Sequence, residues 1–126
     1  MSNGFQKGIS LKKLVNSFKN AFSGLRVAIL QEQTFKIQAF IAIFVLLLSF
    51  YFKVSKIDFL ILFLVMILVL SLELINSQIE RILDYLNQEF DEKIKIIKDL
   101  SAAAVLLTAL SSLIIGLLTF LPYIIK

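Results

Sequence analysis

Two long uncharged stretches of the chain predict helices that cross a membrane. The first runs over 37–52, between two lysines whose side chains can snorkel and so lengthen a short span. The other runs over 100–125, with Pro122 near its end. A helix of that length comfortably crosses a bilayer core of about 30 Å.

A third apolar stretch lies between these two and ends differently. It begins at Phe59, stays uncharged to Leu72 and then meets Glu73 without a glycine, a proline or a turn signal. Its helical pattern continues past Glu73. We therefore expect one continuous helix over 59–84, whose second half leaves the hydrocarbon as a cytoplasmic extension.

The segment over 10–31 alternates apolar and polar positions with the period of an α-helix. The apolar positions step by three and four residues and are Leu11, Val15, Phe18, Phe22, Leu25 and Ile29. The opposite face comprises Lys12, Asn16, Lys19, Ser23 and Arg26. Ser10 is a candidate N-cap. Such a helix lies in the plane of the membrane interface, where its basic residues can meet anionic headgroups.

These segments predict an all-α membrane protein with three transmembrane helices and an N-terminal amphipathic surface helix, in a single domain over 1–126. Lysine and arginine favour the cytoplasmic side of a membrane. Residues 1–36 carry six of them and 73–99 carry four, against two in the link 53–58 and one at the C-terminus. We therefore expect a cytoplasmic N-terminus and an external C-terminus.

Composition agrees with a membrane protein and narrows the chemistry. The chain is 59% hydrophobic and 17% charged, whereas soluble domains average about 45–50% apolar and about 25% charged residues. It contains no cysteine and no histidine, which excludes thiol nucleophiles, Cys/His zinc sites and Ser-His-Asp triads. Any metal site must be built from oxygen ligands, which favours Mg²⁺.

The strongest chemical signal is a polar face on the helix predicted over 59–84. It comprises Glu73, Asn76, Ser77, Glu80 and Asp84. At about 100° per residue, the other four lie within about 60° of Glu73. A carboxylate at or inside the membrane is costly, so Glu73 marks a functional site by default. The alternative for Glu80 and Asp84 is a solvated face paired with Arg81 or Lys98.

Two further charged positions lie near the predicted membrane boundary. Lys98, followed by Asp99, begins the last span, where it either anchors the helix or neutralises phosphate. Glu32 ends the surface helix and is an exposed charge unless it joins Glu80, because a cation site needs two or more oxygens. The spacing leaves open whether they meet within one chain or between neighbouring chains.

The last span also carries small residues every four positions. They are Ala104, Thr108, Ser112 and Gly116. Small residues along one seam let helices approach closely in lipid. This seam predicts a tight bundle and association between copies of the chain.

Two runs of the chain form a specific pattern, E-L-I-N-S-Q-I-E-R-I-L-D at 73–84 and K-D-L-S-A-A-A-V-L at 98–106. With these runs, the chain resembles the small bacterial integral-membrane diacylglycerol kinases and the related undecaprenol kinases. G-L-R-V-A at 24–28 and E-x-x-F-K at 32–36 fit the same family at matching spacing, so the resemblance covers roughly 10–125.

The resemblance implies a homotrimer in the bacterial cytoplasmic (inner) membrane, with active sites at the cytoplasmic interface shared between subunits. The implied activity is transfer of the γ-phosphoryl group of Mg·ATP to a membrane lipid alcohol. The expected substrate is diacylglycerol, giving phosphatidic acid, with undecaprenol as the alternative. The implied cofactor is Mg²⁺. The implied partners are ATP, the lipid and further copies of the chain, and no nucleic acid.

The resemblance also assigns site residues. Glu73 would be the general base and contact the lipid together with Lys13. Glu32 and Glu80 would hold the metal and ATP. Further nucleotide-binding positions would be Lys13, Asn20, Glu89, Phe90, Asp91, Lys98 and Asp99. Asn76 and Asp84 would support the site. Four residues depart from those usual in the family, namely Lys13, Asn20, Gln38 and Asp91.

Several readings stay open at this point. N-S at 76–77 and G-L-R at 24–26 favour a diacylglycerol kinase, whereas F-L-P at 120–122 favours an undecaprenol kinase. A non-enzymatic ion or proton pathway would need polar residues through the full depth of the membrane, but 37–52 offers only Gln38 and Ser49. A structural membrane subunit would not need a clustered acidic face.

Overall fold

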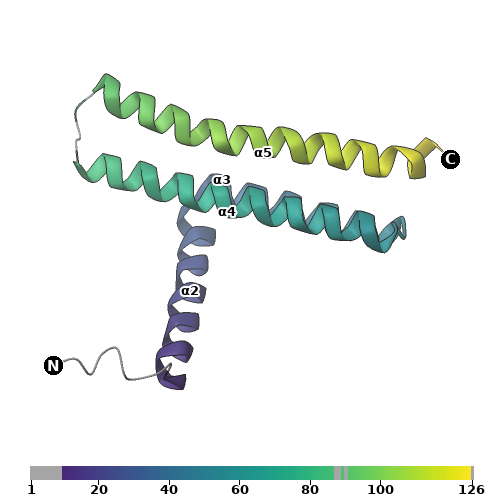
Figure 1. Ribbon diagram of the computed structural model, residues 1–126, viewed down its shortest axis with the longest axis horizontal. Helices are drawn as coiled ribbons and strands as arrows, with labels where there is room; N and C mark the ends of the chain where they lie inside the picture. Colours follow the sequence, from purple (N-terminus) through teal and green to yellow (C-terminus); the bar gives the residue numbers. More distant parts are fainter. Residues whose placement is uncertain (1–9, 87–88, 90, 126) are drawn as a thin grey trace.

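The computed structural model describes residues 10–86, 89 and 91–125, and the regular elements among them are helices. They are α2 (Leu11–Gln31), α3 (Gln33–Tyr51), α4 (Lys56–Leu86) and α5 (Glu92–Ile125). Helices α3, α4 and α5 lie side by side, and α2 projects roughly perpendicular to them (Figure 1). The predicted all-helical fold is confirmed. Helices α3, α4 and α5 are each long and apolar enough to cross a membrane.

The long helices extend beyond the uncharged stretches that predict them. Helix α3 begins before the charged Lys36, whose N–H donates to the carbonyl of Glu32 at 3.0 Å. Helix α5 begins eight residues before the uncharged stretch 100–125. At 1.5 Å per residue, α4 and α5 are about 46 and 51 Å long, against a bilayer core of about 30 Å. Both helices are therefore long enough to carry their charged ends out of the hydrocarbon.

A single extended residue separates α2 from α3. Glu32 has φ −101° and ψ 101°, which interrupts the helical path, and α2 and α3 run in different directions on either side of it (Figure 1). At the other end of α2, Ser10 occupies the expected N-cap position, but its side chain makes no capping hydrogen bond. The turn at Glu32 directs α2 away from the bundle.

The link between α3 and α4 is closed by local hydrogen bonds. Lys53 adopts a left-handed conformation with φ 52°, and the N–H of Val54 donates to the carbonyl of Ser49 at 3.1 Å. This is the Schellman arrangement that ends many helices. Ser55 then caps α4, because its Oγ accepts the N–H of Asp58 at 3.1 Å. The tight link forces α3 and α4 to run antiparallel.

One face of α4 forms the centre of the bundle. Its apolar part is buried and comprises Leu62, Val65, Met66 and Val69. Met66 and Val65 pack with Ala42 of α3, and Ile115 of α5 lies against the same cluster. The buried positions recur at three and four residues, as expected for one stripe of a helix. The site described next continues this stripe toward the C-terminal end of α4.

Candidate functional site

Three polar side chains continue the buried stripe of α4. Glu73, Asn76 and Ser77 are only 4%, 8% and 6% exposed. The Ser77 Oγ donates to the backbone carbonyl of Glu73 at 3.0 Å, so the hydroxyl leaves the Glu73 carboxylate free. Burying polar groups is costly unless they are hydrogen-bonded. The prediction that these three residues share one face is confirmed, and that face points into the bundle.

The amide of Asn76 has one satisfied end and one unsatisfied end. Its Nδ2 donates to Glu80 Oε1 at 3.4 Å. Its Oδ1 is buried and accepts no hydrogen bond from the part of the chain that the structure describes. Leaving a buried acceptor unpaired typically costs about 1–3 kcal/mol. The Asn76 Oδ1 is therefore suited to accept a hydrogen bond from a hydroxyl or to face a cation.

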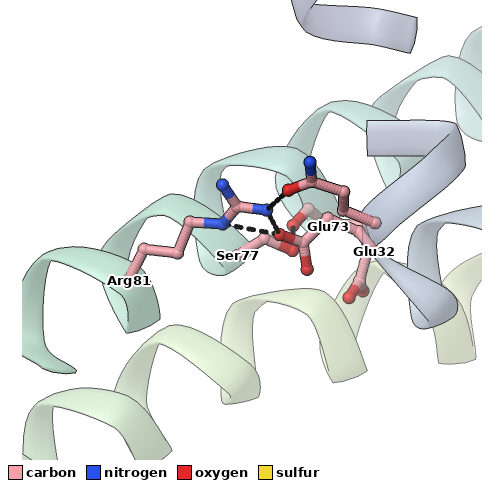
Figure 2. A network of polar contacts seen from close by, with 5 residues as sticks. Glu32, Glu73, Ser77 and Arg81 are labelled. Atoms are coloured by element: carbon pink, nitrogen blue, oxygen red, sulfur yellow. Dashed lines mark hydrogen bonds and ion pairs between the residues drawn. The ribbon is translucent and has the colours of Figure 1, made fainter. Parts of the chain in front are cut away.

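Glu32 is brought to the same region by an ion pair with α4 (Figure 2). The Arg81 guanidinium donates to Glu32 Oε1 through Nε at 2.8 Å and also contacts that oxygen through a terminal nitrogen. The same terminal nitrogen donates to Gln31 Oε1 at 3.1 Å. Arg81 thus binds both residues at the junction of α2 and α3. Of the two basic partners that the sequence offers for Glu80 and Asp84, namely Arg81 and Lys98, Arg81 binds Glu32 instead.

The carboxylate of Glu73 lies in an acidic environment. Glu73 is within range of the negative charges of both Glu80 and Glu32. Glu32, which is bound to Arg81 of α4, therefore lies near the acidic face of its own chain. One arginine, Arg81, offsets part of this accumulated negative charge.

The carboxylates of this region can bind Mg²⁺ only together with further ligands, as happens when the ion is bound with a nucleotide. Among the described residues, no group of three or more Asp, Glu, His or Cys side chains could hold a metal by itself. Mg²⁺ usually takes one or two carboxylates and completes its shell with water and phosphate oxygens. Glu80, which accepts a hydrogen bond from Asn76, and Glu32, which is bound to Arg81, offer such carboxylates. The residues are hence compatible with Mg²⁺ that arrives with phosphate groups.

Two exposed ion pairs involve the other charged candidates. Lys98 donates to Asp84 Oδ1 at 2.6 Å, linking α5 to α4. Lys95 donates to Asp99 Oδ2 at 2.8 Å within α5. The alternative that Asp84 belongs to a solvated face paired with Lys98 matches this geometry. Exposed pairs of this kind contribute about 0–1 kcal/mol, so both Lys98 and Asp99 can exchange partners easily.

The segment before α5 has a structural role at Asp91. Its Oδ1 accepts the N–H of Lys93 at 2.8 Å, which makes Asp91 the N-cap of α5. Glu89 is exposed. Phe90, the remaining position assigned to the nucleotide here, lies outside the described residues.

The two candidates on α2 are distant from the carboxylates of their own chain. Lys13 and Asn20 are exposed on the helix that projects from the bundle (Figure 1). At 1.5 Å per residue, they lie about 28 and 18 Å along the helix axis from Glu32. Within a single chain they do not join the polar face of α4.

The model of the prokaryotic diacylglycerol kinase family matches residues 19–120, which contain α3, α4 and the buried polar face. The chain belongs to the prokaryotic diacylglycerol kinase family. Lys13 lies before the matched range, whereas Glu32, Glu73 and Glu80 lie inside it.

Relatives in this family carry two different names. The chain is 37% identical over 112 residues to the undecaprenol kinase of Bacillus subtilis, covering 89% of this chain and 91% of the relative. It is 34% identical over 110 residues to a diacylglycerol kinase of a Synechocystis species, covering 86% and 63%. It is 32% identical over 99 residues to the diacylglycerol kinase of Haemophilus influenzae, covering 79% and 84%.

The small-residue seam of α5 is half-buried at Thr108, Ser112 and Gly116. Ala104 is exposed, and a Cβ added at Gly116 would meet no atom within 4 Å. The Thr108 and Ser112 hydroxyls donate to carbonyls of their own helix. Gly116 and Ser112 line an apolar groove between α3 and α5, together with Gln38. At Gly116, the seam therefore leaves open space beside α5 and does not pack tightly against another helix of the same chain.

The sequence reasoning missed the role of Arg81 and Gln31. Arg81 follows Glu80 directly and therefore points about 100° away from it on the helix. That offset was the available signal that Arg81 serves a different partner. The partner itself lies 49 residues earlier in the chain, and no local pattern identifies it.

Proposed function

We propose that this chain is a lipid kinase that transfers the γ-phosphoryl group of Mg·ATP to the hydroxyl of a membrane lipid alcohol, with diacylglycerol as substrate and phosphatidic acid as product. The observation that carries the proposal is the buried polar end of the α4 stripe, where Glu73 and the unpaired Asn76 Oδ1 lie beside an apolar core. Membership of the prokaryotic diacylglycerol kinase family supports it.

Each residue of the α4 face has a role in this proposal. The Glu73 carboxylate accepts the proton of the lipid hydroxyl. At the same time the hydroxyl oxygen bonds to the γ-phosphorus, and the bond between the γ-phosphorus and ADP breaks. Asn76 Oδ1 accepts a hydrogen bond from the same hydroxyl before the transfer. Glu32 and Glu80 hold Mg²⁺, which when bound neutralises charge on the phosphate groups. Burial keeps competing water away from Glu73 and Asn76, which favours both of these roles.

Nucleotide binding is assigned to exposed residues around this face. Lys98 and Asp99 would exchange their present ion-pair partners for the nucleotide. The further positions proposed for ATP are Lys13, Asn20, Glu89, Phe90 and Asp91, with Asp84 in support. Lys13 would also contact the lipid.

The membrane placement completes the proposal. The charged ends of α4 and α5 would lie on the cytoplasmic side of the bacterial inner membrane, where ATP is found, with the C-terminus external. Helix α2 would lie in the interface, its exposed apolar residues such as Phe18 and Phe22 directed into lipid. A lipid hydroxyl at the same depth could then meet both Glu73 and ATP.

We infer that the active form is a homo-oligomer, a trimer as the family resemblance implies. Lys13 lies about 28 Å from Glu32 along α2 and is too distant to share one ATP with it in the same chain. A neighbouring chain can supply Lys13 instead. The open space at Gly116 gives a second chain room for close helix contact.

Undecaprenol is the second candidate substrate. The similarity to the Bacillus subtilis undecaprenol kinase, over 91% of that protein, favours it. Both substrates offer a hydroxyl at the membrane interface, so the same catalytic face serves either. The choice depends on contacts with the lipid body.

The test is to reconstitute the purified chain in vesicles with γ-labelled ATP and either diacylglycerol or undecaprenol. We expect labelled phosphatidic acid in the first case. Labelled undecaprenyl phosphate alone would show that the substrate is undecaprenol and not diacylglycerol. If neither lipid gains phosphate while the vesicles conduct ions, the kinase proposal is wrong and the ion-pathway reading is favoured.

A further inference from the structure

Arg81 occupies a position that the proposed reaction does not yet explain. It binds Glu32 and Gln31 from α4, across 49 and 50 residues of sequence (Figure 2). Its side chain is 37% exposed and that of Glu32 is 22% exposed, so the pair is partly removed from water. Partial burial and the fork of an arginine make this pair stronger and more directional than the exposed Lys95–Asp99 pair.

The site of this contact is the break in the helix path. Glu32 is the extended residue between α2 and α3, and its backbone N–H and carbonyl bond to Ala28 and Lys36 on either side. Ala28 and Phe35, four residues before and three after, are 3% and 4% exposed. These backbone hydrogen bonds and buried neighbours hold the junction, and Arg81 binds the Glu32 carboxylate.

The geometry of the contact leaves one carboxylate oxygen available. Both guanidinium contacts go to Oε1 of Glu32. Within the described part of the chain, no hydrogen bond or ion pair involves Oε2. An ionised carboxylate accepts about four hydrogen bonds or ligands in total. Arg81 can therefore hold Glu32 in place while Oε2 binds a cation.

We propose that Arg81 is a positioning residue that aims the Glu32 carboxylate at the metal–nucleotide site and fixes the α2–α3 junction to α4. This inference rests on the proposed function, since it takes Glu32 as a metal ligand. Groups that orient a metal ligand typically change metal affinity by about 10–100-fold when removed. Gln31 acts as a second anchor point for the same guanidinium.

The test compares Mn²⁺ binding in the purified, oligomeric protein with a non-hydrolysable ATP analogue, measured by electron paramagnetic resonance. Mn²⁺ serves as a paramagnetic substitute for Mg²⁺, and the readout does not depend on turnover. For Arg81→Gln we expect an affinity about 10-fold weaker or more. Arg81→Lys should fall between this variant and the original, because lysine restores the charge but not the two-point fork.

Two further variants separate positioning from general loss of structure. Gln31→Ala keeps the Arg81–Glu32 pair and should weaken Mn²⁺ binding by less than Arg81→Gln. Lys56→Gln removes an exposed cation at the opposite end of α4 and should leave the affinity unchanged. In kinase assays, Arg81→Gln should raise the Mg²⁺ concentration needed for half-maximal rate and leave the KM for the lipid unchanged.

The possible results are distinguishable. Unchanged Mn²⁺ affinity in Arg81→Gln would overturn the inference, as would tighter binding, which would show that Arg81 competes with the cation. An equal loss in the Lys56→Gln control would also overturn it. If the original protein binds Mn²⁺ with the nucleotide but phosphorylates no lipid, the proposed function fails, and the effect of Arg81→Gln on Mn²⁺ binding still decides the role of Arg81.

Discussion

The length of α2 gives a specific prediction about how active sites are shared between chains. Glu32 lies within electrostatic range of Glu73 in the same chain, whereas Lys13 lies about 28 Å along α2 from Glu32. If one ATP contacts Lys13 and the carboxylates, then Lys13 must come from a neighbouring chain. Each active site would then combine Glu32 and Glu73 of one subunit with Lys13 of the next.

Mixing two inactive variants tests this arrangement. Lys13→Ala and Glu73→Gln should each be inactive alone. After subunit exchange at equal amounts, half of the sites have an intact Glu73, and half of those have an intact neighbouring Lys13. For a closed ring of identical contacts, about a quarter of the original rate should therefore return. The assay is transfer of label from ATP to the lipid in detergent, with exchange followed by two affinity tags.

A matched control uses residues of the same site. Glu32→Ala mixed with Glu73→Gln should recover nothing, because every site carries one of the two defects. Recovery in this control would contradict the placement of Glu32 beside Glu73 of its own chain. No recovery with Lys13→Ala, despite demonstrated exchange, would refute the shared site, and full activity of Lys13→Ala alone would remove Lys13 from it.

Three further outcomes follow from individual contacts. Glu80→Ala should lower the rate at low Mg²⁺ and recover part of it at high Mg²⁺, whereas an unchanged Mg²⁺ dependence would remove Glu80 from the metal site. Asp91→Ala should lower the free energy of unfolding by about 0.5–2 kcal/mol, because the N-cap of α5 is lost. Asp91→Asn should keep both the cap and the KM for ATP. A raised KM for ATP in Asp91→Asn would show that Asp91 contacts the nucleotide directly. Lys53→Gly should raise the melting temperature in detergent, because glycine removes a left-handed strain of up to about 1 kcal/mol, and a lower melting temperature would contradict that strain.

Periodicity alone was sufficient to predict the polar face of α4. Glu73, Asn76 and Ser77 lie at helical spacing directly after an apolar run, and the structure buries all three. The helix geometry fixes which side chains share a face, so local sequence carries this information. Glu80 lies on the same side but is exposed, because the stripe leaves the packed part of the bundle.

The contacts of Glu32 and Asp91 needed the structure. The Arg81–Glu32 pair depends on how the α2–α3 junction packs against α4, and neither residue's neighbours in sequence report that packing.

Helix α3 begins at Gln33 because backbone hydrogen bonds continue through Lys36. A charge at a helix end does not stop the helix, so an uncharged run underestimates its length. Asp91 was assigned to the nucleotide by resemblance, while its position before α5 is that of an N-cap.

The central claim is that the buried carboxylate of Glu73 takes the proton from a lipid hydroxyl. Its most direct test is the Glu73→Gln variant, which keeps the shape of the side chain and removes the base. The measurement is the rate of phosphate transfer to the lipid, alongside Mn²⁺–nucleotide binding in the same preparation. We predict a loss of about 10²–10⁴-fold in rate with nucleotide binding retained. A variant that binds nucleotide normally and keeps more than about a tenth of the original rate would contradict the claim.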